Sequence, residues 1–402
     1  MVYCWHQNTT GDQVKKLPAR TYQDAIEYLA DAFDHDLSAR NERNMRRAVE
    51  EAYRELPLQA YWTYYRRREV LNTVPSQSTG TISYTHSTRT VALTGSTFPS
   101  GVEKYRLIIG NAHYDIESRT SSTAIVLPEL SNPGADVASG TAYTLYKSEY
   151  ILPENFRRMI AMYDITQRRL IEPVEDSTEQ MLQNAALWSP GVPLYYAIRN
   201  TGEVVDRLSV IFSAPPSSAR GYDLMYDAKP RAFGVPWKYS TGTVSVSDGG
   251  TAVTGSGTSF PSNCAGCVIR FSVNSADEPT GPYGSVVAGN HVDNPYVFQT
   301  TISSYTSGTS VTLADAAPQA FSGVSYTISD PIDIEDGAMF TAFLRLSEAK
   351  YASLMNYDKA EKREEAALRA LILAKESDKR TMDKRQLPIV TQQWWTISST
   401  EG

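Results

Sequence analysis

The sequence is poor in cysteine and has no long hydrophobic run. Its three cysteines, spread over 402 residues, cannot form a disulfide scaffold, so we expect synthesis and folding in a reducing compartment such as the cytoplasm. Residues 1–10 lack the apolar run of a secretory signal, and no stretch approaches the ~20 apolar residues that a membrane-spanning helix needs. The sequence therefore predicts a protein that is neither exported by that route nor embedded in a membrane.

An excess of positive charge is also missing. The formal net charge is −7, whereas a dedicated nucleic-acid binder needs a concentrated cationic face that releases counterions from phosphates. The composition leaves room for a local basic patch only. Hydrophobic residues nevertheless make up 41% of the chain, which is typical of a folded protein and excludes a disordered one.

Motifs of catalysis and metal binding are absent from the sequence. None of the five histidines has metal-ligand spacing, and there is no phosphate-binding loop or nucleophile elbow. Cys264 and Cys267 have CxxC spacing, but a structural zinc site needs four ligands and Cys4 is remote in the sequence. We therefore expect no catalytic residue, no metal site and no cofactor, and no enzymatic activity.

The chain contains instead an internal duplication. The segment Ser78–Ser83 recurs as Ser240–Ser245, and Thr97–Ser100 is echoed by Ser259–Ser262, both at an offset of 162 residues. Further matches complete the two copies: Ile116–Leu127 with Ile302–Leu313 at an offset of 186, and Ser139–Leu145 with Ser322–Ile328 at an offset of 183. The second copy thus carries about 24 extra residues between Arg270 and Gln299.

Both copies alternate apolar and polar residues and are punctuated by Gly, Ser and Thr, a pattern typical of short antiparallel strands. Strands this short must close on themselves or pack face to face, so each copy is predicted to be a small β-barrel or sandwich. We call the copies β-module 1 (76–150) and β-module 2 (237–332).

The remainder of the chain predicts a helical frame. Apolar residues recur every three or four positions in Tyr22–Ala32 and Arg40–Glu55, and Pro57 is expected to end or kink the second helix. A further helix is predicted from Pro153, with Phe156 and Met159 in its buried stripe. Residues 193–199, 208–213 and 222–229 have the composition of strands in a small sheet.

Residues 335–379 contain no proline and one early glycine, which permits either one helix of ~65 Å or two helices joined by a polar bend. The predicted fold class is therefore α+β: a helical frame, built from an N-terminal helical bundle and a long C-terminal helix, with a small sheet and the two β-modules. The expected segments are 1–75 (helical core), 76–150, 151–236 (helix plus small sheet), 237–332, 333–380 (C-terminal helix) and 381–402 (extended tail).

Two groups of residues are candidates for binding. Arg66, Arg67 and Arg68 follow a tyrosine pair and suit either a subunit interface, through bidentate pairing with carboxylates, or contact with DNA phosphates. The acidic total charge favours the interface. Trp394 and Trp395 stand in a polar C-terminal tail, where they would either anchor the chain to a partner or fold back into a groove of their own subunit.

The order of these elements resembles that of the head-to-tail adaptor (connector) proteins of tailed bacteriophages. The resemblance is carried by the N-terminal helical pair, including Ala48–Glu55, by the β-rich insertion, and by the Pro153–Arg158 segment that follows. It covers roughly residues 15–75, 147–235 and 331–402, and Gly/Ser/Thr-rich β-modules are frequent decorations of phage virion proteins.

The resemblance implies a virion protein of the neck or tail, made in the host cytoplasm. It implies a twelve-membered homo-oligomeric ring beneath the portal protein, with Trp394 and Trp395 reaching the portal and the other face receiving tail, nozzle or fibre proteins. DNA would pass through the lumen with weak contacts, and the family supplies no catalytic residues. The alternative is a phage receptor-binding or tail-fibre protein whose β-modules bind glycans; such proteins are usually trimers.

Overall fold

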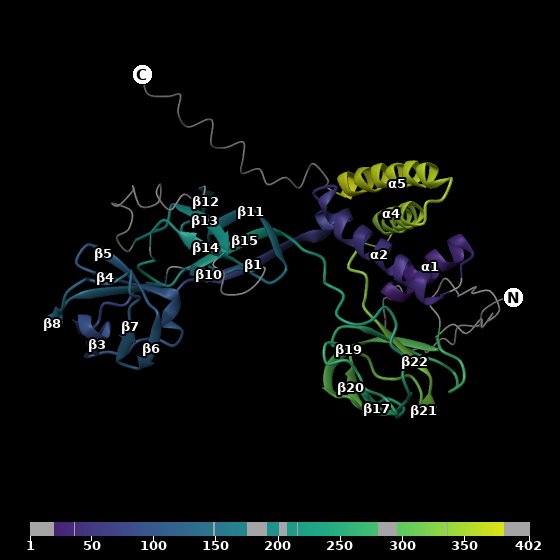
Figure 1. Ribbon diagram of the computed structural model, residues 1–402, viewed down its shortest axis with the longest axis horizontal. Coiled ribbons are helices and arrows are strands. Elements are labelled where there is room, and N and C mark those ends of the chain that lie inside the picture. Colours follow the sequence, from purple (N-terminus) through teal and green to yellow (C-terminus); the bar gives the residue numbers. More distant parts are fainter. Residues whose placement is uncertain are drawn as a thin grey trace, which may run out of the picture. The chain divides into compact units, whose positions relative to one another are not determined.

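The computed structural model describes residues 20–35, 37–147, 149–174, 191–200, 207–214, 216–279, 296–335 and 337–381. The chain forms two compact units (Figure 1): unit 1 comprises Met1–Tyr64 and Pro230–Gly402, and unit 2 comprises Tyr65–Lys229. Unit 2 is therefore an insertion into the chain of unit 1. Within unit 1, Asp333 joins the two sides of the insertion point, because the Tyr64 hydroxyl donates to Oδ1 (2.9 Å) and the Arg231 N–H donates to Oδ2 (3.1 Å).

The expected helical frame is wrong, because the protein is mostly β. Both units contain a large curled sheet, and the described residues contain four α-helices, all of them in unit 1. The described part of unit 2 has no helix beyond short 3-10 turns. The segment 151–236 was expected to hold a helix and a small sheet, and its described residues contain strands and no α-helix.

The N-terminal helical pair is confirmed as α1 (Tyr22–Phe33) and α2 (Ala39–Glu55). Helix α1 starts at a capping box, in which the Thr21 hydroxyl accepts from the Asp24 N–H and the Asp24 carboxylate accepts from the Thr21 N–H. Pro57 lies in a 3-10 turn, η1 (Leu56–Leu58), that ends α2 as its missing N–H requires.

The C-terminal helical region consists of two helices, α4 (Ala338–Leu354) and α5 (Ala360–Thr381). Helix α4 ends in a Schellman motif centred on Asn356, whose φ is +52°. The Tyr357 N–H bonds to the Ala352 carbonyl (3.1 Å) and the Asn356 N–H to the Ser353 carbonyl (3.2 Å). Of the two alternatives that the sequence left open, the structure has the two helices, and α4 packs against α1, α2 and α5.

The helix predicted after Pro153 is also wrong: Phe156–Asp164 forms strand β11. Two β-bulges, between Phe156 and Arg158 and between Met159 and Ala161, interrupt its two-residue alternation. The bulges bring apolar residues to spacings of three and four in the sequence, which is why the segment imitates a helix.

Strand β11 belongs to a seven-stranded sheet in unit 2, ordered β1-β15-β11-β12-β13-β14-β10. All neighbouring pairs are antiparallel except the short parallel pair of β12 with β13. The strands predicted at 193–199, 208–213 and 222–229 are confirmed as β13, β14 and β15, in a sheet larger than expected. The strands are β1 (Arg66–Asn72), β10 (Glu149–Ile151), β12 (Arg169–Pro173), β13 (Tyr195–Asn200), β14 (Leu208–Phe212) and β15 (Gly221–Ala228).

The two β-modules share one topology. In β-module 1 the strands are β2 (Thr81–Thr85), β3 (Thr90–Thr94), β4 (Tyr105–Ile109), β5 (Ala112–Asp115), β6 (Ser118–Ser121), β7 (Ala124–Val126), β8 (Val137–Thr141) and β9 (Tyr143–Lys147). In β-module 2 they are β16 (Thr243–Val246), β17 (Ala252–Ser256), β18 (Val268–Phe271), β19 (Phe298–Ser307), β20 (Ser310–Leu313), β21 (Phe321–Val324) and β22 (Tyr326–Ser329). Strands β5 and β6 of the first copy together correspond to the single long strand β19 of the second.

The strand registers match at the offsets of the sequence repeat, except for a shift of one residue at Tyr84–Val137 and Val246–Phe321. Thr81 pairs with Thr94 as Thr243 does with Ser256, and Leu107 pairs with Leu145 as Ile269 does with Ile328. In β-module 2 the two edge strands, β21 and β22, are separated only by Ser325. The sheet must therefore curl until its edges come together, and the enclosed space holds the apolar core of the module.

Each unit contains one β-module, and both modules pack against the rest of their unit through the same pair of strands. Arg270 on β18 and Ser329 on β22 point out of β-module 2 and are buried against α1, where they contact Asp24 and the Gln23 N–H. The equivalent positions in β-module 1 are Ile108 on β4 and Tyr146 on β9. These pack in an apolar cluster with Ala197 and Ile211 of the seven-stranded sheet.

Candidate interaction surfaces

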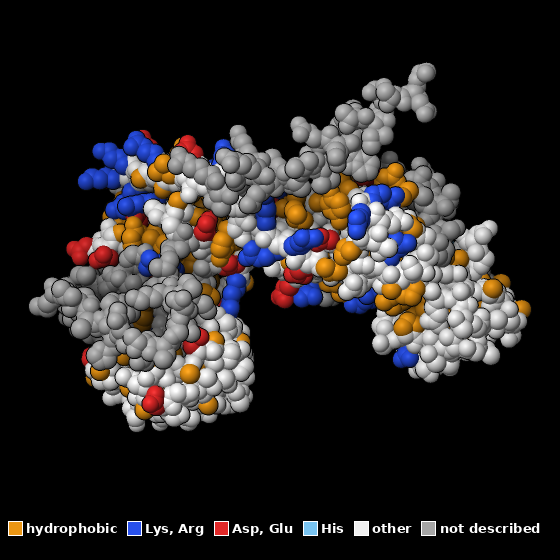
Figure 2. Space-filling model, turned by 180° about the vertical axis from the view of Figure 1, so that it is seen from behind, with side chains coloured by type: hydrophobic (Ala, Val, Ile, Leu, Met, Phe, Trp, Pro, Cys, Tyr) orange, Lys and Arg blue, Asp and Glu red, His pale blue; other side chains and the backbone are white. Residues whose placement is uncertain are grey.

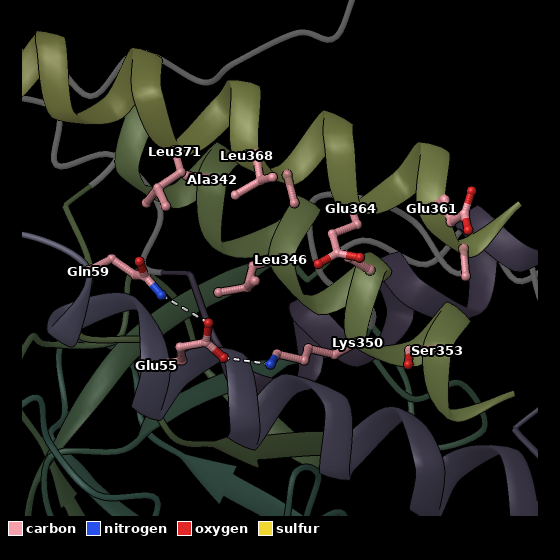
Figure 3. Close-up of a pocket in the computed structure, with 13 residues that line it drawn as sticks. Glu55, Gln59, Ala342, Leu346, Lys350, Ser353, Glu361, Glu364, Leu368 and Leu371 are labelled. Atoms are coloured by element: carbon pink, nitrogen blue, oxygen red, sulfur yellow. Dashed lines mark hydrogen bonds and ion pairs between the residues drawn. The ribbon is translucent and has the colours of Figure 1, made fainter. Parts of the chain in front are cut away.

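A groove in unit 1 runs between the C-terminal end of α2 and helices α4 and α5 (Figure 3). Its volume is about 390 Å³, and its floor is formed by small and apolar side chains. Leu346 projects into it from α4, and Leu368 and Leu371 project from α5. Four alanines complete the lining: Ala342, Ala349, Ala360 and Ala367. We call this space the α2/α4/α5 groove.

The groove exposes more apolar surface than a helical hairpin needs for its own packing. Leu368 in the groove is 55% exposed, and Ile372, one turn further along α5 and outside the groove lining, is 56% exposed. Burying a wholly exposed side chain of this size contributes roughly 1.5–3 kcal/mol, so covering these half-exposed side chains would contribute about half of that each. Exposed apolar residues that cluster in a groove with a polar rim are typical of an interaction site.

The rim of the groove is acidic. Glu55 is neutralised within the chain, because it forms an ion pair with Lys350 (2.5 Å) and accepts a hydrogen bond from Gln59 (2.9 Å). Glu361 and Glu364 on α5 are both exposed, and in the described parts of the chain neither has a salt-bridge partner. Two uncompensated carboxylates therefore lie at one end of an apolar groove.

A buried carboxylate fixes the helical hairpin that forms the groove. Glu348 of α4 is 2% exposed and accepts hydrogen bonds from Arg345 (2.8 and 3.0 Å), from Arg363 of α5 (2.9 Å) and from the Tyr28 hydroxyl of α1. Burial and the Glu348 carboxylate raise the pKa of Tyr28, so this hydroxyl remains a donor at physiological pH. The Arg363 guanidinium also lies over the ring of Phe33, 4.0 Å from its centroid.

The opposite flank of α5 has a different character. It forms a shallower hollow lined by Arg345, Lys362 and Arg369 together with Glu365. Leu373, 63% exposed, is its large apolar residue. The two flanks of one helix thus offer an apolar groove with an acidic rim and a largely charged hollow.

Unit 2 has a second exposed apolar face, on one side of its seven-stranded sheet. Val70 of β1, Met225 of β15, Tyr163 of β11 and Leu170 of β12 lie on adjacent strands and are 40–55% exposed. In Figure 2 the described surfaces of the β-modules are mostly uncharged polar side chains and backbone. Over the rest of the described surface, hydrophobic side chains are mixed with charged ones. Strand β1 forms the edge of this sheet.

The arginine triplet lies on β1, where the alternation of a strand divides it between two faces. Arg68 is on the exposed face and makes a bidentate ion pair with Asp223 of the same chain, with Nε 2.7 Å from each carboxylate oxygen. Arg66 is on the same face, directly opposite Asp227 in the register. The three guanidinium groups therefore do not form one cationic cluster, and their contact with a subunit or with DNA stays a prediction.

Arg67 is on the other face of β1, opposite Tyr226. Burial and the hydrogen bond to Glu69 raise the pKa of Tyr226 to about 12, and the charge of Arg67 acts in the opposite direction. Arg67 is thus part of the polar margin of the sheet's core. The sequence could not separate the three arginines, because they were assigned to the helical core at 1–75 and not to a strand.

The other predicted docking residues, Trp394 and Trp395, lie outside the described residues. Cys264 and Cys267 are described, and both are buried in the core of β-module 2 as free thiols. Burial and the neighbouring Asp330 raise the pKa of the Cys267 thiol, which makes it a poor nucleophile. Their CxxC spacing reflects packing next to β18.

In the described parts of the chain, no group of three or more His, Cys, Asp or Glu side chains is placed to hold a metal ion. None of the described helices is both long and apolar enough to cross a membrane. The chain matches no protein-family model, no curated protein and no solved structure. The interaction surfaces themselves are therefore the basis for an argument about function.

Proposed function

We propose that the chain is a structural subunit of a ring, namely the adaptor that joins the capsid portal to the tail of a tailed bacteriophage. The observation that carries the proposal is the presence of two unlike exposed apolar surfaces, the α2/α4/α5 groove in unit 1 and the sheet face in unit 2. A ring closes through heterologous interfaces, in which each subunit uses two different surfaces.

The resemblance to adaptor proteins now rests on fewer elements. The N-terminal helical pair and the β-rich insertion support it, but the segment after Pro153 is a strand and no longer contributes. The partners implied are the portal protein on one face of the ring and tail, nozzle or fibre proteins on the other. The acidic total charge suits a conduit along which DNA must slide with weak contacts.

The deciding experiment is the mass and symmetry of the assembly. We expect native mass spectrometry of the purified protein to give a twelve-membered ring, and averaging of intact particles to place that ring at the portal vertex. A trimer would favour the receptor-binding alternative, in which the β-modules bind glycans. A monomer that is absent from virions would contradict both.

A further inference from the structure

We propose that the α2/α4/α5 groove binds the segment Met382–Val390 of a second copy of this chain. The inference rests on the proposed ring and deepens it, because it names the segment that would occupy one of the two exposed apolar surfaces. It rests on the chemistry of the groove, on the sequence that follows α5, and on the distances that the chain can span.

The chemistry of the segment complements that of the groove. The groove has an apolar floor at Leu368 and Leu371 and two carboxylates without salt-bridge partners in the described residues, Glu361 and Glu364. The segment has two cations, Lys384 and Arg385, next to one anion, Asp383, and after Gln386 it continues with the aliphatic residues Leu387, Ile389 and Val390. In the bound segment, the cations would pair with the two carboxylates of the rim. The aliphatic side chains would cover the apolar floor.

Distance favours a second copy over the same chain. Glu364 lies 17 residues before Thr381 on α5, which is ~26 Å along a helix. The four residues from Thr381 to Arg385 span at most ~14 Å when fully extended. The cations of one chain could therefore reach its own Glu364 only with backbone and side chains all fully extended, whereas those of a neighbouring copy are not restricted in this way.

The proposal leaves the rest of the tail available. Trp394 and Trp395 follow the segment by four and five residues, so they would emerge beyond the groove and could still serve as the predicted portal contact. A groove on one copy and an arm from the next form a heterologous contact, which closes into a ring when the rotation between copies permits it.

Disulfide trapping between full-length chains tests the contact directly. In a Cys4→Ser background, one chain carries Leu368→Cys and a second, of different tag length, carries Ile389→Cys. After mild oxidation we expect the mixed species as the main product on non-reducing gels. Leu373→Cys is the matched control, since Leu373 is equally exposed on the opposite flank of α5; it should give at least tenfold less.

A charge exchange in the same pair of cysteine chains provides a second test. Adding Glu361→Lys and Glu364→Lys to the groove chain should lower the trapping yield several-fold, and Lys384→Glu with Arg385→Glu in the arm chain should restore it. Equal trapping at positions 368 and 373 would overturn the proposal. So would a disulfide that forms only within one chain when both cysteines are combined.

The outcomes separate this contact from the adaptor proposal. Trapping in an assembly that lacks twelvefold symmetry would retain the groove-and-arm contact and reject the adaptor ring. A twelve-membered ring without trapping would retain the ring and reject the contact.

Discussion

A buried ion pair connects β-module 2 with the helices of unit 1. Arg270 is 1% exposed, and its two terminal nitrogens each lie 2.7 Å from an oxygen of Asp24, which is fully buried. Asp24 also belongs to the capping box of α1. Such a pair adds little net stability, but removing one partner leaves an uncompensated charge in the interior.

We therefore expect Asp24→Ala to destabilise unit 1 by roughly 3–5 kcal/mol. The double variant Asp24→Leu/Arg270→Met should lose much less than the sum of the single changes, because no charge stays buried. The measurement is the urea dependence of thiol labelling at Cys264 and Cys267, which are both buried in β-module 2, in a Cys4→Ser background. Additive losses would show that the two side chains are not coupled.

We expect His113 of β-module 1 to make the stability of unit 2 depend on pH. Burial and the nearby charge of Arg106 lower its pKa below the usual 6.5. The unfolded chain then binds a proton more readily than the folded chain, so stability is retained above pH ~6.5 and falls as the pH drops below it. We expect the melting temperature of His113→Gln to rise relative to that of the natural chain between pH 7.5 and pH 5.5. A constant difference would refute this assignment.

At the scale of elements, the turn between α4 and α5 determines the shape of the groove. The Schellman motif at Asn356 ends α4 and lets α5 fold back against it. From the sequence alone, the charged residues around this turn were also compatible with one continuous helix over residues 335–379. Asn356 itself was the available signal, since asparagine is one of the few residues other than glycine that accept a left-handed conformation.

Substitution at Asn356 should follow the cost of a positive φ. We expect Asn356→Gly to be neutral or slightly stabilising and Asn356→Val to destabilise by about 1–2 kcal/mol, because a β-branched side chain clashes in this conformation. Hydrogen exchange of the last turn of α4 measures the effect locally. Similar protection in both variants would mean that the turn is held by tertiary contacts alone.

The elements that could be predicted were those with a clear local pattern. Helices α1 and α2 have apolar residues at helical spacing, strands β13 to β15 are short segments rich in apolar residues, and the internal duplication was enough to locate both β-modules. Strand β11 could not be found, because its two bulges replace the alternation of a strand with helical spacings. The groove could not be found either, since it depends on how α5 packs against α4 and α2 and not on any local pattern.

At the scale of the whole molecule, the insertion of one unit into the other has an experimental consequence. Unit 2 is continuous in sequence and holds three apolar clusters of its own. We expect residues 65–229, expressed alone, to fold with a cooperative thermal transition and a β-type circular dichroism spectrum. A fragment that is soluble but lacks such a transition would show that unit 2 needs the rest of the chain.

In the two β-modules, the residues that determine the fold differ from the residues that determine where the module packs. Their strand registers and topology agree, yet one module packs on a helix through Arg270 and the other on a sheet through Ile108, at equivalent positions. A few outward-facing side chains on one pair of strands thus determine what the module packs against, while the remaining residues determine the fold of the module. After a duplication of the gene segment, substitution of these outward-facing contact residues is enough to give the copied module a new packing partner while its core stays intact.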